Sequence, residues 1–226
     1  MKGDISAEDG RERVRRLMGL APNQRAVRVP GGPACELLAD LASLQRDFEM
    51  ARQFLRHFAE LAQDEVEPDS PNQSFWISAL TMYGRAFAKG RRHAARATPD
   101  IYDDSDLEAH RFLIDIRNKF IAHSANAFEQ AAIFAIIADS SDGGFTVQGA
   151  GSQHSSFARL SRKRALQVSK MCEVQLADID ARMATARNAV MAEVRDLGEE
   201  RISRLPELGM VRIDESAVGR DRPQYR

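Results

Sequence analysis

Apolar residues recur at steps of three and four along most of the chain, which is the spacing of amphipathic helices. The first such stretch runs from Ala34 to Ala62. Ser70 and Pro71 then suit the N-cap and the first turn of a second helix, whose apolar residues continue until Thr98. The apolar face of this second helix is broad, so the pattern predicts a central position in a helical bundle.

The second half of the chain predicts two more long helices. The acidic residues at 103–106 supply caps for a third helix that runs to about Ser124. Ser161 caps the last helix, whose apolar positions again lie three and four apart until Gly198. This last helix is long for a small bundle, so we expect its far end to pack on a partner chain; packing within its own subunit is the alternative.

Between these two helices the hydrophobic period changes. Residues 131–138 are almost wholly apolar, residues 140–144 have the composition of a turn, and residues 145–149 alternate apolar with polar. This pattern predicts a β-hairpin over about 131–154, with a buried helix over 131–138 as the alternative. The expected fold class is therefore mainly α: a bundle of four long helices with a β-hairpin insert before the last helix.

The two ends of the chain lack this periodicity. Residues 1–33 carry alternating charges and several Pro and Gly breaks. They predict a mobile leader, with a short helix over Glu8 to Met18 as the alternative. The helical domain is expected over residues 34–204, and an irregular tail over residues 205–226.

Composition narrows the class of protein. No apolar run approaches the roughly 18 residues of a membrane helix, so we expect no membrane association. Cys35 and Cys172 lie far apart, which predicts no disulfide framework and a reducing, cytoplasmic location. The 32 basic residues against 33 acidic ones argue against a general nucleic-acid coat. Of the basic residues 27 are Arg and 5 are Lys, which leaves room for a local anion site, because Arg binds phosphate as a planar fork.

One segment of the third helix combines the residue types of acid–base chemistry on phosphate. Arg117 and Asn118 are followed by His123. A helical wheel centred on Phe112 places His123 inside the apolar face and Arg117 at its border. A His side chain can transfer protons near neutral pH, and Arg can clamp a phosphate. The alternative is that both side chains satisfy buried polar groups of the bundle.

The segment Ile116–Ser124, at the end of an acidic-capped helix, resembles the signature of the HEPN superfamily, in particular its abortive-infection-like, largely uncharacterised bacterial branches. The segment Tyr83–Phe87, with Gly90 and Arg92, is similar to a second recurring block of those branches. The order helix, helix, helix, hairpin, long helix also fits. The resemblance covers roughly residues 35–200.

The resemblance implies a metal-independent endoribonuclease or an RNA-binding protein, acting as a homodimer through its long helices in a toxin–antitoxin or phage-defence setting. It implies that Arg117 clamps the phosphate, that His123 is the acid or base, and that Asn118 orients the reacting groups. The toxin members that are modified on tyrosine end the motif in His-x-Tyr, and here no Tyr follows His123. A non-catalytic helical interaction or nucleotide-binding module is the alternative function.

A second group of polar residues accompanies this segment. Tyr83, Arg85, Arg92 and His110 are expected to bind phosphate, RNA or a nucleotide in the same cleft, because the two arginines lie seven residues apart on one helix face. The alternative is that they are solvated or ion-paired with the acidic residues at 103–106. No Cys/His metal spacing and no phosphate-binding Gly-rich loop occurs, so we expect neither a metal nor a cofactor.

Overall fold

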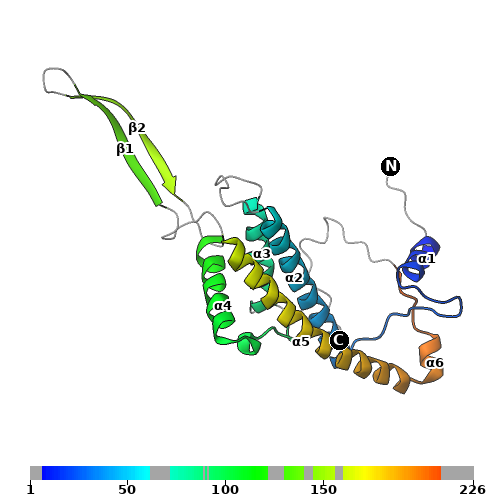
Figure 1. The fold of residues 1–226 in the computed structure, drawn as a ribbon. Helices are drawn as coiled ribbons and strands as arrows, with labels where there is room; N and C mark the ends of the chain where they lie inside the picture. Colours follow the sequence, from blue (N-terminus) through cyan, green and yellow to red (C-terminus); the bar gives the residue numbers. More distant parts are fainter. Residues whose placement is uncertain are drawn as a thin grey trace. The chain divides into compact units, whose positions relative to one another are not determined.

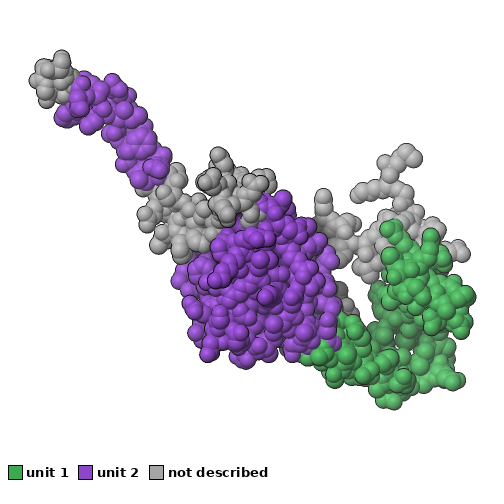
Figure 2. All heavy atoms as spheres, in the orientation of Figure 1, with its two compact units in different colours: residues 1–42, 181–226 green, residues 43–180 purple. Residues whose placement is uncertain are grey.

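The computed structural model describes residues 7–61, 72–88, 90, 92–121, 130–139, 145–155 and 160–209. The features expected at Ser70, Pro71, His123, Ser124 and in residues 210–226 lie outside this part of the chain. The described residues are mainly helical. They belong to two compact units, coloured separately in Figure 2: unit 1 comprises residues 1–42 and 181–226, and unit 2 comprises residues 43–180.

Unit 2 is a bundle of long helices (Figure 1). The Tyr83 side chain joins three of them, because its ring lies 6.0 Å from that of Phe48 and its hydroxyl lies 2.9 Å from His110 Nδ1. Gln167 of the last long helix donates to Asp106 at 2.9 Å. These contacts connect α2 (Pro33–Leu61), α3 (Asn72–Phe87), α4 (Asp104–Ile116) and α5 (Arg162–Asp196), with the 3₁₀ helix η1 (Pro99–Ile101) before α4.

The bundle encloses a core of almost completely buried apolar side chains, to which all four helices contribute. Its members include Phe48, Leu55, Phe58, Trp76, Leu80, Leu113, Ile116, Val168, Met171 and Ile179. Burial of such side chains is the main source of stability for a helical bundle. The four-helix bundle, with its hairpin before the last long helix, is thereby confirmed.

The helix ends follow from local chemistry. Asp103 caps α4, since its side chain accepts a hydrogen bond from the Asp106 N–H at 2.8 Å. Ser161 caps α5 in the same way, through the Arg164 N–H at 3.1 Å. Just past the end of α5, Gly198 has a φ of 76°, a conformation that favours glycine at a helix terminus. These three boundaries are as expected.

The expected extension of the second helix to Thr98 is wrong, because α3 ends at Phe87. Gly90 has a low helix propensity. The Arg92 guanidinium turns back and donates to the backbone carbonyl of Arg85 at 3.2 Å. This bond occupies one of the last carbonyls of α3, which a helix end leaves open. The chain thus leaves the helical path after Phe87, and the Arg92 side chain lies beside α3.

The hairpin consists of β1 (Gln130–Asp139) and the antiparallel β2 (Phe145–Ser155) (Figure 1). The strand over β1 decides between the two alternatives for this segment, and the buried helix is excluded. The register shifts between Ile136 and Ile137, so that Gln148 is an extra residue in β2, a β-bulge. Large apolar side chains of both strands are exposed.

Unit 1 contains the helices α1 (Ala7–Leu17) and α6 (Gly198–Ser203). Helix α1 lies in the segment 1–33, which was expected as a mobile leader. It confirms the alternative for this segment, a short helix over Glu8 to Met18. The Arg28 N–H donates to the carbonyl of Pro206 at 2.8 Å, which ties this segment to the chain after α6. Among the described residues, no helix has the length and apolarity needed to span a bilayer.

Candidate functional site

Arg117 stands where α4 changes from an α-helix to a π-helix. The last α-helical residue is Ile116, and Arg117–Ile121 form the π-helix η2. The Arg117 N–H still donates to the carbonyls of Leu113 and Ile114, so the α-helical turn passes directly into the wider one. Single π-helical turns are rare in proteins and occur frequently at functional sites.

The aliphatic part of the Arg117 side chain lies against the backbone of α3 at Gly84. A Cβ atom at Gly84 would come within 3.0 Å of Arg117 Cγ and 3.1 Å of Cδ, so the missing side chain makes the room that Arg117 occupies. At its other end, Arg117 Nη1 donates to Asn118 Oδ1 at 2.9 Å. The Arg117 side chain is half-buried and Asn118 is exposed. The Arg117 side chain is thus held along its aliphatic part by Gly84 and at its guanidinium by Asn118.

The helical wheel centred on Phe112 is right that Leu113 and Ile116 are buried and wrong about Phe112 itself. Phe112 is 38% exposed, and the guanidinium of Arg164 lies 5.5 Å from the centre of its ring. The buried side chains of α4 are Ala109, His110, Leu113 and Ile116. The wheel also assumed a constant α-helical rotation as far as His123, which the π-helix does not keep. His123 itself lies outside the described residues.

Tyr83 and His110 form a buried polar pair between α3 and α4. The Tyr83 hydroxyl donates to the Tyr102 hydroxyl at 3.3 Å. It lies 2.9 Å from His110 Nδ1, which donates to it in the tautomer that carries the proton on Nδ1. The Phe87 ring meets the His110 ring edge-on, with 4.4 Å between their centres. The hydroxyls of Tyr83 and Tyr102 and the Nδ1 atom of His110 therefore face one another.

The cluster is electrically neutral near pH 7. Burial raises the pKa of Tyr83 and of Tyr102 above that of an ordinary tyrosine, because the phenolate would lose its hydration. Burial, and after it the positive charge of Arg111, lowers the pKa of His110. A neutral imidazole between two neutral phenols offers no cation to a phosphate.

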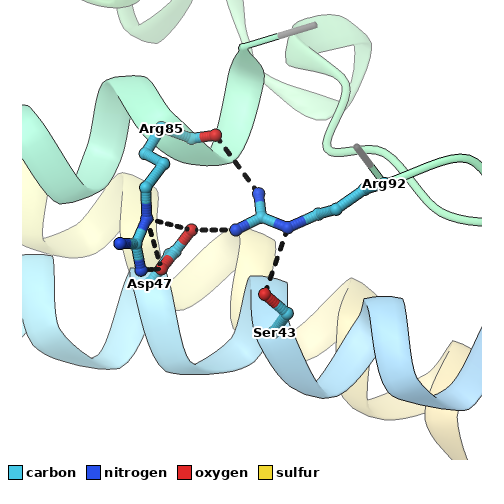
Figure 3. A network of polar contacts seen from close by, with 4 residues as sticks. All are labelled: Ser43, Asp47, Arg85 and Arg92. Carbon is cyan, nitrogen blue, oxygen red and sulfur yellow. Dashed lines mark hydrogen bonds and ion pairs between the residues drawn. The ribbon is translucent and has the colours of Figure 1, made fainter. Parts of the chain in front are cut away.

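The two arginines meet on Asp47 of α2 (Figure 3). Asp47 is completely buried, and Arg85 Nε donates to its two carboxylate oxygens at 3.0 and 3.1 Å. Arg92 donates to the same carboxylate through Nη2 and to Ser43 Oγ through Nε at 3.2 Å. The hydrogen bonds with Asp47 raise the pKa of Arg85 above its ordinary value.

The structure brings the four predicted polar residues together as two pairs, Tyr83 with His110 and Arg85 with Arg92. The contacts that join each pair differ from the expected ones. Arg85 lies in α3 and Arg92 lies beyond its end, so a shared helix face is not what unites them. Asp47 and Tyr102, which hold the two pairs, were not among the residues predicted from the sequence. A signal for Asp47 exists, since it lies three residues after Leu44 and thus on the apolar stripe of α2, where a carboxylate needs a partner.

Other candidate sites are weaker. In the described part of the chain, no three His, Cys, Asp or Glu side chains are grouped so as to hold a metal ion. A hollow of about 320 Å³ in unit 1 is lined by Arg11, Arg15 and Arg25 together with Glu12 and Glu207. Arg11 is ion-paired with Glu207 at 3.4 Å. None of the predicted site residues lines this hollow.

Comparisons of the chain with models of protein families, with curated proteins and with solved structures found no match. What the chain does must therefore be inferred from its own residues.

Proposed function

We propose that the chain is a metal-independent, RNA-binding endoribonuclease of the HEPN type that acts in the cytoplasm. In this proposal Arg117 clamps the phosphate, His123 is the acid or base, and Asn118 orients the reacting groups. The observation that carries the proposal is the placement of Arg117, whose stem lies against Gly84 at the start of a π-helical turn. A guanidinium held in this way is preorganised for an anion, since little of its freedom remains to be lost on binding.

The reaction requires only these side chains, the RNA and solvent water. His123 takes the proton of a ribose 2′-hydroxyl, the 2′ oxygen attacks the neighbouring phosphorus, and the bond from phosphorus to the 5′ oxygen breaks. The departing 5′ oxygen takes up a proton from a solvent water, and the hydroxide so formed takes back the proton held by His123, so the products are a 2′,3′-cyclic phosphate and a 5′-hydroxyl. Arg117 donates two N–H groups to the phosphate oxygens, whose charge grows in the transition state.

Tyr83, Arg85, Arg92 and His110 have a supporting role in this proposal. Each already has a protein partner, and together they fix α3 and the segment after it against α2 and α4. Because Arg117 lies against Gly84 of α3, the position of this helix sets the position of the clamp.

The test is cleavage of mixed RNA by the homogeneous protein in EDTA. We expect Arg117→Ala and His123→Ala each to lower the cleavage rate at least about 10²-fold, because each removes a group that acts in the transition state. The matched control is Lys119→Ala, which removes a positive charge from the same π-helical turn. Lys119 is exposed and ion-paired with Asp115 at 3.3 Å, so we expect its loss to change the rate by less than about twofold. Cleavage that survives both Arg117→Ala and His123→Ala contradicts the proposal.

The substitution Gly84→Ala tests whether the position of the Arg117 side chain matters for cleavage. The added methyl group meets the Arg117 stem and displaces it, whereas alanine favours the helix itself. We expect about tenfold slower cleavage from a displaced clamp. Gly90→Ala is the control, since no atom lies within 4 Å of the added methyl group.

A non-catalytic binding module is the second candidate, favoured by the protein partners of Tyr83, Arg85, Arg92 and His110. Under this alternative, the wild-type protein retains RNA on a filter without cleaving it, and Arg117→Ala abolishes the retention. Absence of both cleavage and retention rules out the ribonuclease and an RNA-binding module, and leaves a helical module that interacts with another partner.

A further inference from the structure

The β1–β2 hairpin exposes most of its large apolar side chains. Ile133 is 77% exposed, Phe145 67% and Val147 65%, and Phe134, Ile136 and Ile137 are also exposed. A lone two-stranded hairpin is marginally stable in water, and three or more strands with an apolar face are usually needed. The hairpin therefore lacks the partner that its composition calls for.

Both faces of the hairpin are apolar. Paired residues share a face, and the register places Ile137 beside Val147 on one face. On the other face Phe134 lies over Gly151 and Ile136 over Gly149, because the two glycines leave room for the larger side chains. β1 lacks the alternation of apolar and polar residues that a strand with one solvated side shows, whereas β2 alternates over residues 145–149.

The two edges of the hairpin differ. β1 pairs without interruption and carries no charge from Gln130 to Ala138, with Asp139 as its last residue. β2 contains the bulge at Gln148, which disrupts the ladder locally and makes the outer edge of β2 a poorer template for a further strand. A long, uncharged, apolar edge strand is a template for another strand. The open edge of the hairpin is therefore β1.

We propose that β1 pairs with β1 of a second copy of this chain, so that two hairpins form one four-stranded antiparallel sheet in the order β2–β1–β1–β2. We choose a second copy of this chain as the partner strand because the β1 edge is neutral and apolar. Two such edges, related by a twofold axis, pair antiparallel without repulsion between charges. Pairing supplies the missing strands. It consumes the open edge of both copies and leaves only the bulged β2 edges outside, so the assembly closes as a dimer.

A twofold axis at Ala135 gives the most favourable cross-strand pairs of large apolar side chains. Ile133 of one copy then lies opposite Ile137 of the other, and Phe134 opposite Ile136, which are favourable β-branched and aromatic pairs. Asp139 lies opposite Ala131, so that the two carboxylates stand at opposite ends of the seam. A fully exposed side chain of this size has about 200 Å² of surface, so the four β1 side chains expose on the order of 450 Å² per copy, of which strand pairing buries only the part that faces the seam. This area is small for an interface, so the dimer is expected to depend on concentration.

The test is the mass of the full-length chain in solution, followed by light scattering and sedimentation over a dilution series. We expect a mass of twice 25.2 kDa that falls to 25.2 kDa on dilution. Ile133→Lys/Ile137→Lys should give the monomer at every concentration, because lysines on an edge strand oppose pairing. The control Gln148→Lys/Ser152→Lys adds the same two charges to β2 and should leave the dimer intact. Helical circular dichroism confirms that each variant is folded.

A disulfide tests the seam directly in a Cys35→Ser background. Ala135→Cys should form a covalent dimer on mild oxidation, because the two residues face each other across the axis. Ala150→Cys, which lies opposite Ala135 on the outer strand, should not. A monomeric wild type overturns the proposal, and so do a dimer that survives the β1 lysines and a dimer without the Ala135→Cys crosslink. Vesicles of neutral and anionic lipid are included, and a monomer that binds them through the hairpin also overturns it. These readouts do not involve RNA, so the proposed function can fail independently.

Discussion

Asp47 is a buried carboxylate that holds two guanidinium groups. Removal of a carboxylate from water costs several kcal/mol, which the contacts with Arg85 and Arg92 offset. The Arg92 side chain is 16% exposed and that of Arg85 is 53% exposed. Solvent screens the more exposed partner, so Arg92 contributes more to the stability of this cluster.

The loss of unfolding free energy on substitution of Arg85 or Arg92 should follow the burial of the two side chains. We expect Asp47→Ala to lower the free energy of unfolding by about 3 kcal/mol, because Arg92 loses its buried partner. Arg92→Met should cost more than Arg85→Met. Urea unfolding followed by circular dichroism measures all three. A cost for Arg85→Met as large as that for Arg92→Met would show that burial does not govern the cluster.

His110 gives the stability a dependence on pH. Its pKa is lowered in the folded state, chiefly by burial, while an unfolded histidine titrates near 6.5. As pH falls below about 6.5 the unfolded chain takes up a proton that the folded chain excludes. This contribution to stability is therefore complete above that pH. It is lost progressively as the pH falls toward the lowered pKa of the folded state.

The measurement is the free energy of unfolding in urea between pH 7.5 and pH 5, where we expect a decrease toward acid. His110→Asn keeps an N–H donor near the Tyr83 hydroxyl but cannot titrate, so its decrease over this range should be smaller. The control is His93→Asn, at an exposed histidine, which should retain the slope of the wild type. Equal slopes for the wild type and His110→Asn would contradict the role of His110.

At the scale of elements, the helices that depend on local signals were predictable. The starts of α4 and α5 follow from Asp103 and Ser161, whose caps act within three residues. The hairpin follows from a change of period, although the same apolar run in β1 also suits a buried helix. The end of α3 at Phe87 was not predictable, and neither was the bond by which Arg92 reaches a carbonyl seven residues back.

The candidate site was less predictable, because its contacts join distant parts of the chain. Asp47 lies 38 residues before Arg85, and neither helix alone shows that they meet. The contact between Gly84 and Arg117 depends on how α3 packs on the end of α4. The π-helix changes the rotation of every later position, so a wheel drawn from the sequence fails beyond Arg117.

At the scale of the whole molecule, the balance of charge limits how RNA can bind. The net charge is −1, and the described residues pair several arginines with carboxylates. A protein with this balance of charge lacks the broad positive potential that attracts polyanions non-specifically, without a shaped binding site. Binding through a confined clamp at Arg117 engages few phosphates, whereas a general coat engages many.

The salt dependence of the affinity for RNA distinguishes a confined clamp at Arg117 from a general basic coat. For single-stranded RNA, log K falls with log salt at a slope of about −0.7 per neutralised phosphate, so one or two phosphates give a slope between about −0.7 and −1.4. Fluorescence anisotropy of a labelled RNA with His123→Ala, which should bind without cleaving, measures this slope between about 50 and 200 mM salt. Adding Arg117→Ala should make it shallower by about 0.7, because one phosphate contact is lost. Adding Lys119→Ala should leave it unchanged. A slope steeper than about −3 would place RNA on a wide basic surface instead of the Arg117 clamp.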